Sequence, residues 1–200
     1  MRAYYDARAA EDDEWYRGTG RFASRERPGW DEELSALVAA VSSLPPARTL
    51  DVACGTAFLT RHLRGFVVGL DQSPRMVAIA QARLPDGLAL AGDAFALPFA
   101  DGAFDRVLAG HFYGHLAGSE REAFLAEARR VAPSLVVVDS AGEDREDREE
   151  WQERRLNDGS VHRVYKRWFT AAGLAAELRG SVSVLHEGRW FVAVCARFAA

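Results

Sequence analysis

Three aspartates stand at the ends of short apolar runs and could hold one ligand between them. They are Asp51, Asp71 and Asp93, and Asp71 follows Asp51 by 20 residues. At that spacing in nucleotide-binding α/β folds, an acid accepts hydrogen bonds from ribose hydroxyls. Three carboxylates in a line suit an adenosine and repel phosphates. Each acid alone could instead be a turn or helix-cap residue.

The residues after Val52 predict a tight turn. All of them are small, in the order Ala53, Cys54, Gly55, Thr56 and Ala57, and small residues let a ligand approach the backbone closely. A dinucleotide-binding turn needs glycine at 53, 55 and 58, so Phe58 argues against NAD. The single lysine, Lys166, follows no glycine-rich loop, which excludes a P-loop nucleotide hydrolase.

Two histidines, His111 and His115, follow the apolar run 104–109 and are the candidate catalytic residues, as general bases. Their spacing of four residues also suits a metal pair, but no third Cys, Asp or Glu stands at a useful spacing, so we expect no metal. A structural or substrate-shaping role is the other interpretation of both histidines, and it stays open.

The elements that must position these side chains alternate between strand and helix. Apolar spacing predicts a helix over 34–44 capped by Asp31, and further helices begin at Ser73-Pro74 and at Ser119 with Glu122 as a capping box. The pattern predicts a doubly wound α/β domain with helices on both faces and a ligand crevice at the carboxyl ends of its central strands. Runs typical of strands buried on both faces of a parallel sheet occupy 49–52, 66–70, 88–91, 104–109 and 135–138.

The sequence after residue 140 changes in character. Eleven of the thirteen residues 143–155 are charged, which favours a solvated helix or loop. Beyond them we expect a helix capped by Thr170 and two closing strands, 182–185 and 189–198, joined by a turn at Glu187-Gly188.

The first 33 residues contain no Val, Ile or Leu but hold six of the chain's 21 aromatic residues. This composition predicts that residues 1–30 form a cap over the crevice of an α/β core, residues 31–200, where aromatic faces attract a positively charged ligand group. Tyr5 and Tyr16 are the first candidates for that contact. The alternative is that the aromatic residues pin a surface helix to the domain.

Length and composition indicate one globular domain, with 200 residues, 27% charged and 48% hydrophobic. The net charge of −4 disfavours nucleic acid as a partner. No apolar run approaches the ~20 residues that cross a bilayer, so no membrane partner is expected. Cys54 and Cys195 stand far apart in a chain whose N-terminus lacks an apolar signal region, which favours free thiols and a cytoplasmic location.

In combination, these motifs resemble the class I S-adenosylmethionine-dependent methyltransferases of the small-molecule type. The resemblance implies one methyltransferase domain over 1–200, with a Rossmann-like, seven-stranded, mostly parallel sheet whose last strand is antiparallel. It also implies S-adenosyl-L-methionine as cofactor and methyl transfer to an oxygen or nitrogen atom of a small molecule. The matching stretches are Leu50–Thr60, Val68–Ala80, Ala91–Phe99, Phe104–Leu116 and Ala123–Asp139.

The same resemblance implies roles for individual residues. The turn 53–55 passes the methionine part of the cofactor, Asp71 holds the ribose, and Asp93 with Ala94 reads the adenine. Gln72 and Met76 flank the adenosine, and His111 lines the methyl-transfer cleft. The family's usual glycines at 53 and 57 are alanines here, which fit if their φ angles stay negative. The cofactor-binding set is Asp51, Ala53, Cys54, Gly55, Asp71, Gln72, Met76, Asp93, Ala94, His111 and Tyr16.

The class of the methyl acceptor is narrowed only by motifs that the sequence lacks. Residues 104–113 lack the Asn/Asp-Pro-Pro-aromatic run that amino-methylating nucleic-acid enzymes resemble, and neither cysteine follows a proline as in cytosine C5 enzymes. A small molecule is therefore expected, with pocket walls from His111, Tyr113 and residues 162–168. A non-catalytic cofactor-binding module and methylation of a macromolecule are the alternatives, and the sequence indicates no oligomeric state.

Overall fold

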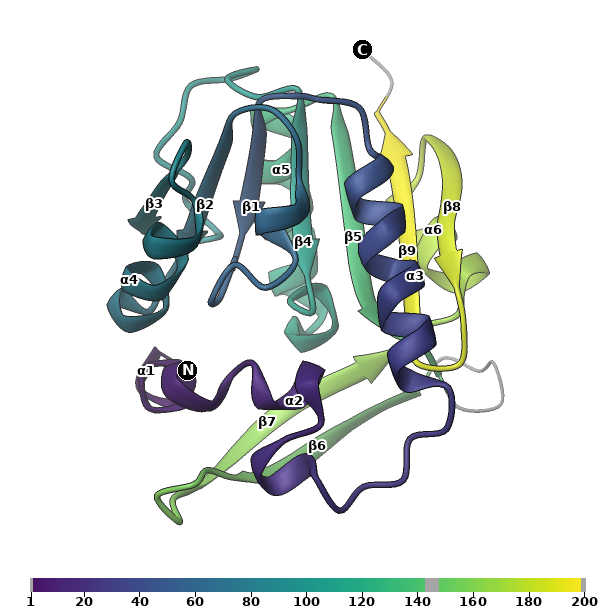
Figure 1. The fold of residues 1–200 in the computed structure, drawn as a ribbon. Coiled ribbons are helices and arrows are strands. Elements are labelled where there is room, and N and C mark those ends of the chain that lie inside the picture. Colours follow the sequence, from purple (N-terminus) through teal and green to yellow (C-terminus); the bar gives the residue numbers. More distant parts are fainter. Residues whose placement is uncertain (1, 143–147, 199–200) are drawn as a thin grey trace.

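A computed structural model describes residues 2–142 and 148–198, and its centre is a seven-stranded sheet (Figure 1). The strand order is β3-β2-β1-β4-β5-β9-β8; β9 runs antiparallel to β5 and to β8, and the other neighbouring pairs are parallel. The expected mostly parallel sheet with a closing antiparallel strand is confirmed. The strands are β1 (Thr49–Val52), β2 (Val67–Asp71), β3 (Leu88–Ala91), β4 (Arg106–Gly110), β5 (Ser134–Ser140), β8 (Ser181–Glu187) and β9 (Phe191–Arg197).

The central strands form because their apolar runs are buried on both faces. Every residue of β1 and β2 is buried, as continuous apolar runs in a parallel sheet predict. Strand β3 was also expected to be buried on both faces, but it lies at the sheet edge, where Leu88 is 52% exposed.

Helices cover both faces of the sheet. Helix α3 (Trp30–Ser43) packs Leu37 and Val41 on one face, and α5 (Gly118–Val131) and α6 (Ala171–Leu178) pack on the other. Helix α4 (Pro74–Arg83) contacts the turn after β1 through Ala80. The short 3₁₀ turns η3 (Thr60–His62) and η4 (Tyr113–His115) follow β1 and β4.

Two of the four expected helix starts are confirmed. The Ser73 hydroxyl accepts the Met76 N–H at 3.2 Å, and the Thr170 hydroxyl accepts the Gly173 N–H at 2.9 Å. The other two caps were wrong. Helix α3 begins after Gly29, whose φ of +76° suits glycine. Asp31 therefore lies inside the first turn, where its negative charge interacts favourably with the helix dipole. Helix α5 begins at Gly118, because the carboxylate of Glu120 accepts the Ala117 N–H.

A separate two-stranded hairpin corrects the expectation of a solvated helix or loop. Strand β6 (Arg148–Arg155) pairs antiparallel with β7 (Val161–Trp168), and residues 143–147 lie outside the described residues. The charged run forms a strand because β7 supplies the buried side chains Val164, Tyr165 and Lys166.

The N-terminal segment, residues 2–29, lies between the carboxyl ends of the parallel strands and the β6–β7 hairpin (Figure 1). It comprises α1 (Arg2–Arg8), η1 (Ala9–Glu11), α2 (Glu14–Arg17) and η2 (Gly20–Phe22). Polar contacts fix it on both sides: Thr56 Oγ1 donates to Asp13 at 2.6 Å, and the Asn157 N–H donates to Glu11 at 2.7 Å. No helix within residues 2–142 and 148–198 is long and apolar enough to cross a membrane.

Candidate functional site

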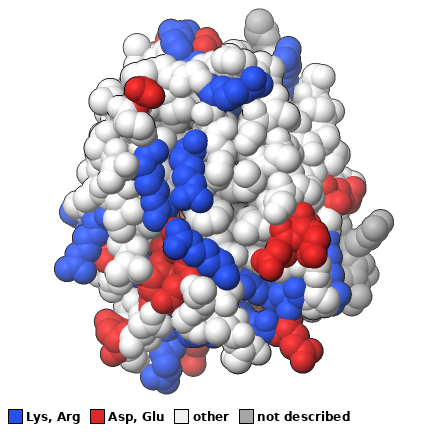
Figure 2. All heavy atoms as spheres, viewed as in Figure 1, with Lys and Arg blue, Asp and Glu red and all other residues white. Residues whose placement is uncertain are grey.

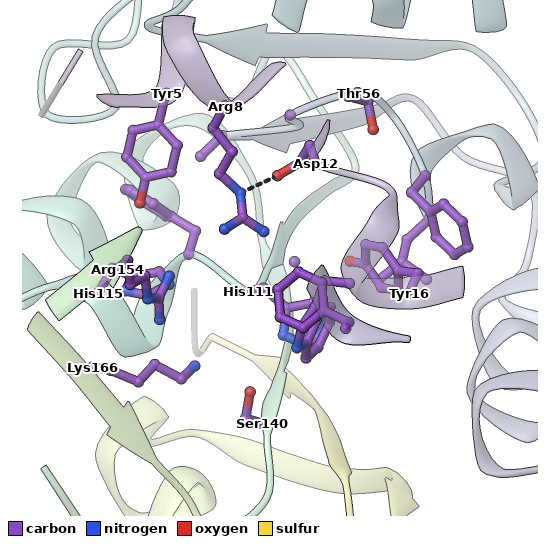
Figure 3. Close-up of a pocket in the computed structure, with 18 of the residues that line it drawn as sticks. Tyr5, Arg8, Asp12, Tyr16, Thr56, His111, His115, Ser140, Arg154 and Lys166 are labelled. Carbon is purple, nitrogen blue, oxygen red and sulfur yellow. Dashed lines mark hydrogen bonds and ion pairs between the residues drawn. The ribbon is translucent and has the colours of Figure 1, made fainter. Parts of the chain in front are cut away.

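A cavity of about 1350 Å³ lies beyond the carboxyl ends of β1, β2, β4 and β5, under the N-terminal segment and the hairpin. Pockets for one small molecule measure roughly 300–1,000 Å³, so this cavity has room for two ligands. We call the part lined by residues 51–60 and 71–76 the turn half. The part lined by His111, His115, Ser140 and the β6–β7 hairpin is the basic half (Figure 3).

Every second residue of the turn 53–57 has its backbone in the left-handed region. The φ angles of Ala53, Gly55 and Ala57 are +58°, +53° and +60°. The expectation that the alanines keep negative φ is therefore wrong. Left-handed geometry costs an alanine roughly 1–2 kcal/mol relative to right-handed geometry, so the turn holds two strained residues at the positions where the family uses glycine.

Asp71, at the end of β2, fastens this turn to the sheet. One carboxylate oxygen accepts the Gly55 N–H at 3.0 Å and the other accepts the Ser73 N–H at 2.9 Å. Each oxygen keeps a second lone pair, and the residue lines the cavity. Burial raises the pKa of Asp71 to about 6, against the two backbone donors that lower it.

Asp51, at the end of β1, is the deepest acid of the turn half. Thr60 Oγ1 donates to one carboxylate oxygen, and the other oxygen is buried without a partner among the described residues. Burial, with a smaller contribution from the charge of Asp71, raises the pKa of Asp51 to about 7.

The remaining residues of the expected cofactor set divide into two groups. Cys54, Gln72, Met76 and Tyr16 line the turn half or its border. Asp93 and Ala94 do not line the cavity: Asp93 is exposed beyond β3, and its carboxylate accepts the Phe95 N–H at 2.9 Å.

Aromatic rings line the cavity where the two halves meet. Tyr16 stacks on Phe58 with a centroid distance of 3.9 Å and an interplanar angle of 4°. Trp15 meets the ring of His111 edge to face at 4.7 Å. Residues of the N-terminal segment and of the strand ends therefore form one aromatic wall.

His111 stands where the two halves meet. Its φ is +52° and its N–H donates to Val138 O at 2.7 Å, which aims the side chain into the cavity. Burial lowers the pKa of His111 to about 4, although Asp139 opposes the shift. Its two ring nitrogens are buried without hydrogen-bond partners in the described part of the chain.

His115 and Lys166 belong to a buried network around Asp139. Asp139 accepts Lys166 Nζ at 2.5 Å and the Gly114 N–H at 2.7 Å. His115 Nδ1 lies 2.7 Å from Tyr165 O, so this nitrogen carries the proton. Burial and then the charges of Lys166 and Arg154 lower the pKa of His115.

Tyr113 was expected in the pocket wall but lies elsewhere. Its ring packs against Phe124 and Phe169 in the core, and its hydroxyl donates to Glu177 at 3.1 Å. Among the residues that the structure describes, no cluster of three His, Cys, Asp or Glu side chains could hold a metal ion.

The sequence reasoning missed several charged or polar lining residues. Arg8 pairs with Asp12 at 2.7 Å, and its guanidinium points into the middle of the cavity (Figure 3). Arg154 and Ser140 also face it. The spacing of four residues between Arg8 and Asp12 indicates a helical ion pair, but nothing in the sequence places that pair over the strand ends.

Residues 50–134 match the family model described as a methyltransferase domain. The chain is 36% identical over 107 residues to the demethylmenaquinone methyltransferase of Thermotoga maritima, covering 51% of this chain and 44% of that protein. It is 39% identical over 130 residues to a dTDP-3-amino-3,6-dideoxy-alpha-D-glucopyranose N,N-dimethyltransferase of Streptomyces fradiae, covering 62% and 48%. The chain thus spans less than half the length of these two curated relatives.

Two solved structures agree with the chain over most of both lengths. A complex of the protein DhpI with SAM and HEP has a TM-score of 0.77 and 28% identity, covering 98% of this chain and 94% of that one. A complex of DhpI with SAH has a TM-score of 0.73 and 27% identity, covering 99% and 95%.

Proposed function

We propose that this chain, a member of the class I S-adenosylmethionine-dependent methyltransferases, transfers a methyl group from S-adenosylmethionine to a small molecule bound beside His111. One observation carries the proposal. A single cavity joins a strand-end turn with two buried carboxylates to a second half lined by histidines and cations. The first half suits the cofactor and the second suits an acceptor.

The turn half fits the cofactor by the chemistry of its donors and acceptors. The unpartnered carboxylate oxygen of Asp51 offers a partner for an ammonium group. The free lone pairs of Asp71 suit ribose hydroxyls. Gly55 has a φ of +53°, which favours glycine, and a Cβ there would be in van der Waals contact with the Asp12 carboxylate at 3.4 Å. Asp93 and Ala94 would meet the adenine only at the exposed edge beyond β3.

The cofactor, when bound, supplies a methyl group attached to a positively charged sulfur, and this sulfur is a good leaving group. The chain's own residues bind, orient and exclude water. The wall of Tyr16, Phe58 and Trp15 keeps solvent from the junction and stabilises positive charge there. His111 is neutral near pH 7, and its ring nitrogens form no hydrogen bond within the described residues, although Nδ1 lies 3.9 Å from the Asp139 carboxylate. It can therefore orient an acceptor through one hydrogen bond.

His115 is the weaker candidate for direct contact. One of its ring nitrogens is held by Tyr165 O, which leaves only the other for an acceptor. We therefore assign to His111 the contact with the acceptor at the junction of the two halves, and we place His115 further into the basic half. The roof formed by the N-terminal segment and the hairpin favours a small molecule over a macromolecule.

Calorimetric titration of S-adenosylhomocysteine tests the cofactor assignment. Asp71→Ala should weaken binding at least tenfold, because each charge-assisted hydrogen bond to the ribose contributes about 1.5–3 kcal/mol. Asp86→Ala, which removes an exposed carboxyl that does not line the cavity, is the matched control and should bind as the wild type does. Equal affinity in all three proteins would show that Asp71 does not hold the ligand.

A further inference from the structure

The cavity carries the opposite charge to the chain as a whole. Nine Lys or Arg side chains line it against five Asp or Glu side chains, whereas the chain has a net charge of −4. Two of those acids, Asp51 and Asp71, belong to the turn half, so the excess of positive charge falls on the basic half and its rim. The basic residues are Arg8, Arg21, Arg25, Arg27, Arg148, Arg154, Arg155, Lys166 and Arg189.

Some of these cations also reach the outer surface, since Arg25, Arg148, Arg155 and Arg189 are exposed. On the face seen in Figure 2, blue and red side chains are interspersed over the lower part, where the N-terminal segment covers the strand ends.

Arg154 is a half-buried lining cation without a carboxylate partner among the described residues. Its hydrogen bond goes to the neutral amide oxygen of Gln152 at 3.2 Å, and it forms no ion pair within the described residues. Figure 3 places it beside His115. After burial itself, the charge of Arg154 contributes to lowering the pKa values of His115, Lys166 and Arg21. Partly buried like charges of this kind are unfavourable until an anion joins them.

Within residues 2–142 and 148–198, Lys166 and Arg8 each pair with one carboxylate. Lys166 donates to Asp139, and an ammonium has three donors. Arg8 donates to Asp12 and to the Tyr4 hydroxyl, and a guanidinium has five donors. Glu11 lies near Arg21 and raises its pKa, but less than burial lowers it. Donors therefore remain for a ligand in the basic half.

We infer that the methyl acceptor is an oxyanion, a carboxylate or a phosphate-type group, held in the basic half by Arg154, Lys166 and Arg8. This inference rests on the proposed function. Planar guanidinium groups pair with such oxygens through two parallel hydrogen bonds. The aromatic side chains Tyr5, Phe112 and Trp168 also line the cavity and leave space for an apolar body on the acceptor.

The transfer step balances without a base. An acceptor oxygen forms a bond to the methyl carbon while the bond from that carbon to sulfur breaks, and the bonding electron pair stays on the sulfur. The acceptor loses one negative charge, the sulfonium loses its positive charge, and no proton moves. Neutral His111 and His115 suit this chemistry, since an ionised oxygen needs no proton removed. The product ester carries less charge, so the cations hold it less tightly than the acceptor.

Three probes with one phenyl body test the inference: benzoate, phenylphosphonate and the neutral benzamide. Each is titrated by calorimetry into protein saturated with S-adenosylhomocysteine, at matched ionic strength. We expect at least one anion to bind at least tenfold more tightly than benzamide. Arg154→Gln should remove most of that preference. Arg163→Gln makes the same charge change on the same hairpin at an exposed site outside the cavity, and it should keep the preference.

Arg154 is a better site for the test than Lys166. Replacing Lys166 would leave the carboxylate of Asp139 buried without its cation, which destabilises the fold. Circular dichroism and the affinity for S-adenosylhomocysteine check that Arg154→Gln is folded and still binds the cofactor product.

The outcomes separate the two proposals. If the wild type does not bind S-adenosylhomocysteine, the proposed function fails. If it binds S-adenosylhomocysteine but neither anion binds better than benzamide, only the oxyanion inference is wrong. An anion preference that Arg154→Gln leaves unchanged overturns it as well. Mass spectrometry of a binding anion after incubation with S-adenosylmethionine should show one added methyl group.

Discussion

Asp51→Asn should change how the stability of the free protein depends on pH. The Asp51 carboxyl is buried with one oxygen unpartnered, and burial raises its pKa from an ordinary 3.8 to about 7. Between these two pH values the unfolded chain has released this proton while the folded chain retains it. The contribution of Asp51 to stability is therefore full below pH 4 and is lost as the pH rises through 7.

The magnitude follows from the two pKa values. Each pH unit in the window removes about 1.36 kcal/mol, so the free energy of unfolding should fall by about 2.5 kcal/mol between pH 5 and pH 8 from this group alone. Asparagine keeps the shape of the side chain and an acceptor for the Thr60 hydroxyl, but it does not titrate. Urea unfolding at both pH values measures the difference between the two proteins.

The comparison cancels the other titrating groups. Asp139 and Asp13 have pKa values lowered by cationic partners, despite burial, and act in the opposite direction, but they are present in both proteins. We expect the wild type to lose about 2.5 kcal/mol more than Asp51→Asn from pH 5 to pH 8. Equal losses in the two proteins would refute the assignment of Asp51 as a buried, largely protonated acid.

Three further predictions concern the turn, the N-terminal segment and the cofactor. Ala53→Gly should stabilise the protein by up to about 1 kcal/mol in urea unfolding, because φ is +58° there. As a control, Ala126→Gly on the exposed side of α5 should destabilise it by about 1 kcal/mol. An Ala53→Gly protein less stable than Ala126→Gly would contradict backbone strain at Ala53. Deleting residues 1–29 should lower the melting temperature and abolish binding of S-adenosylhomocysteine, because Tyr16 packs in the core beside Phe58; unchanged calorimetric affinity would exclude a role of the segment in binding. Affinity for S-adenosylhomocysteine should rise from pH 5 to pH 8, because Asp71 and Asp51 must ionise to pair with the ligand and have pKa values of about 6 and 7. An affinity that falls over this pH range would contradict the pairing.

The sequence was most informative where local pattern and burial agree. The run before Asp71 is apolar throughout, β1 is apolar apart from Thr49 and Asp51, and both strands are buried on each face. The starts at Ser73 and Thr170 were correct because one side chain satisfies one backbone donor at each site.

Long-range pairing explains most of what the sequence could not predict. Residues 148–155 look solvated by composition, yet they form a strand because β7, further along the chain, pairs with them. The positive φ angles of Ala53 and Ala57 are imposed by the turn and not by alanine's own preference. Arg8 and Arg154 converge on the cavity only because the N-terminal segment and the hairpin both cover the strand ends.

Thermal unfolding with S-adenosylmethionine, S-adenosylhomocysteine or NAD tests the central claim most directly. A ligand at one hundred times its dissociation constant adds about 2.7 kcal/mol, which for a domain of this size corresponds to a rise of roughly 5–11 °C in melting temperature. We predict that rise with S-adenosylmethionine and with S-adenosylhomocysteine, and none with NAD. A rise with NAD alone would contradict the assignment of the turn half to S-adenosylmethionine.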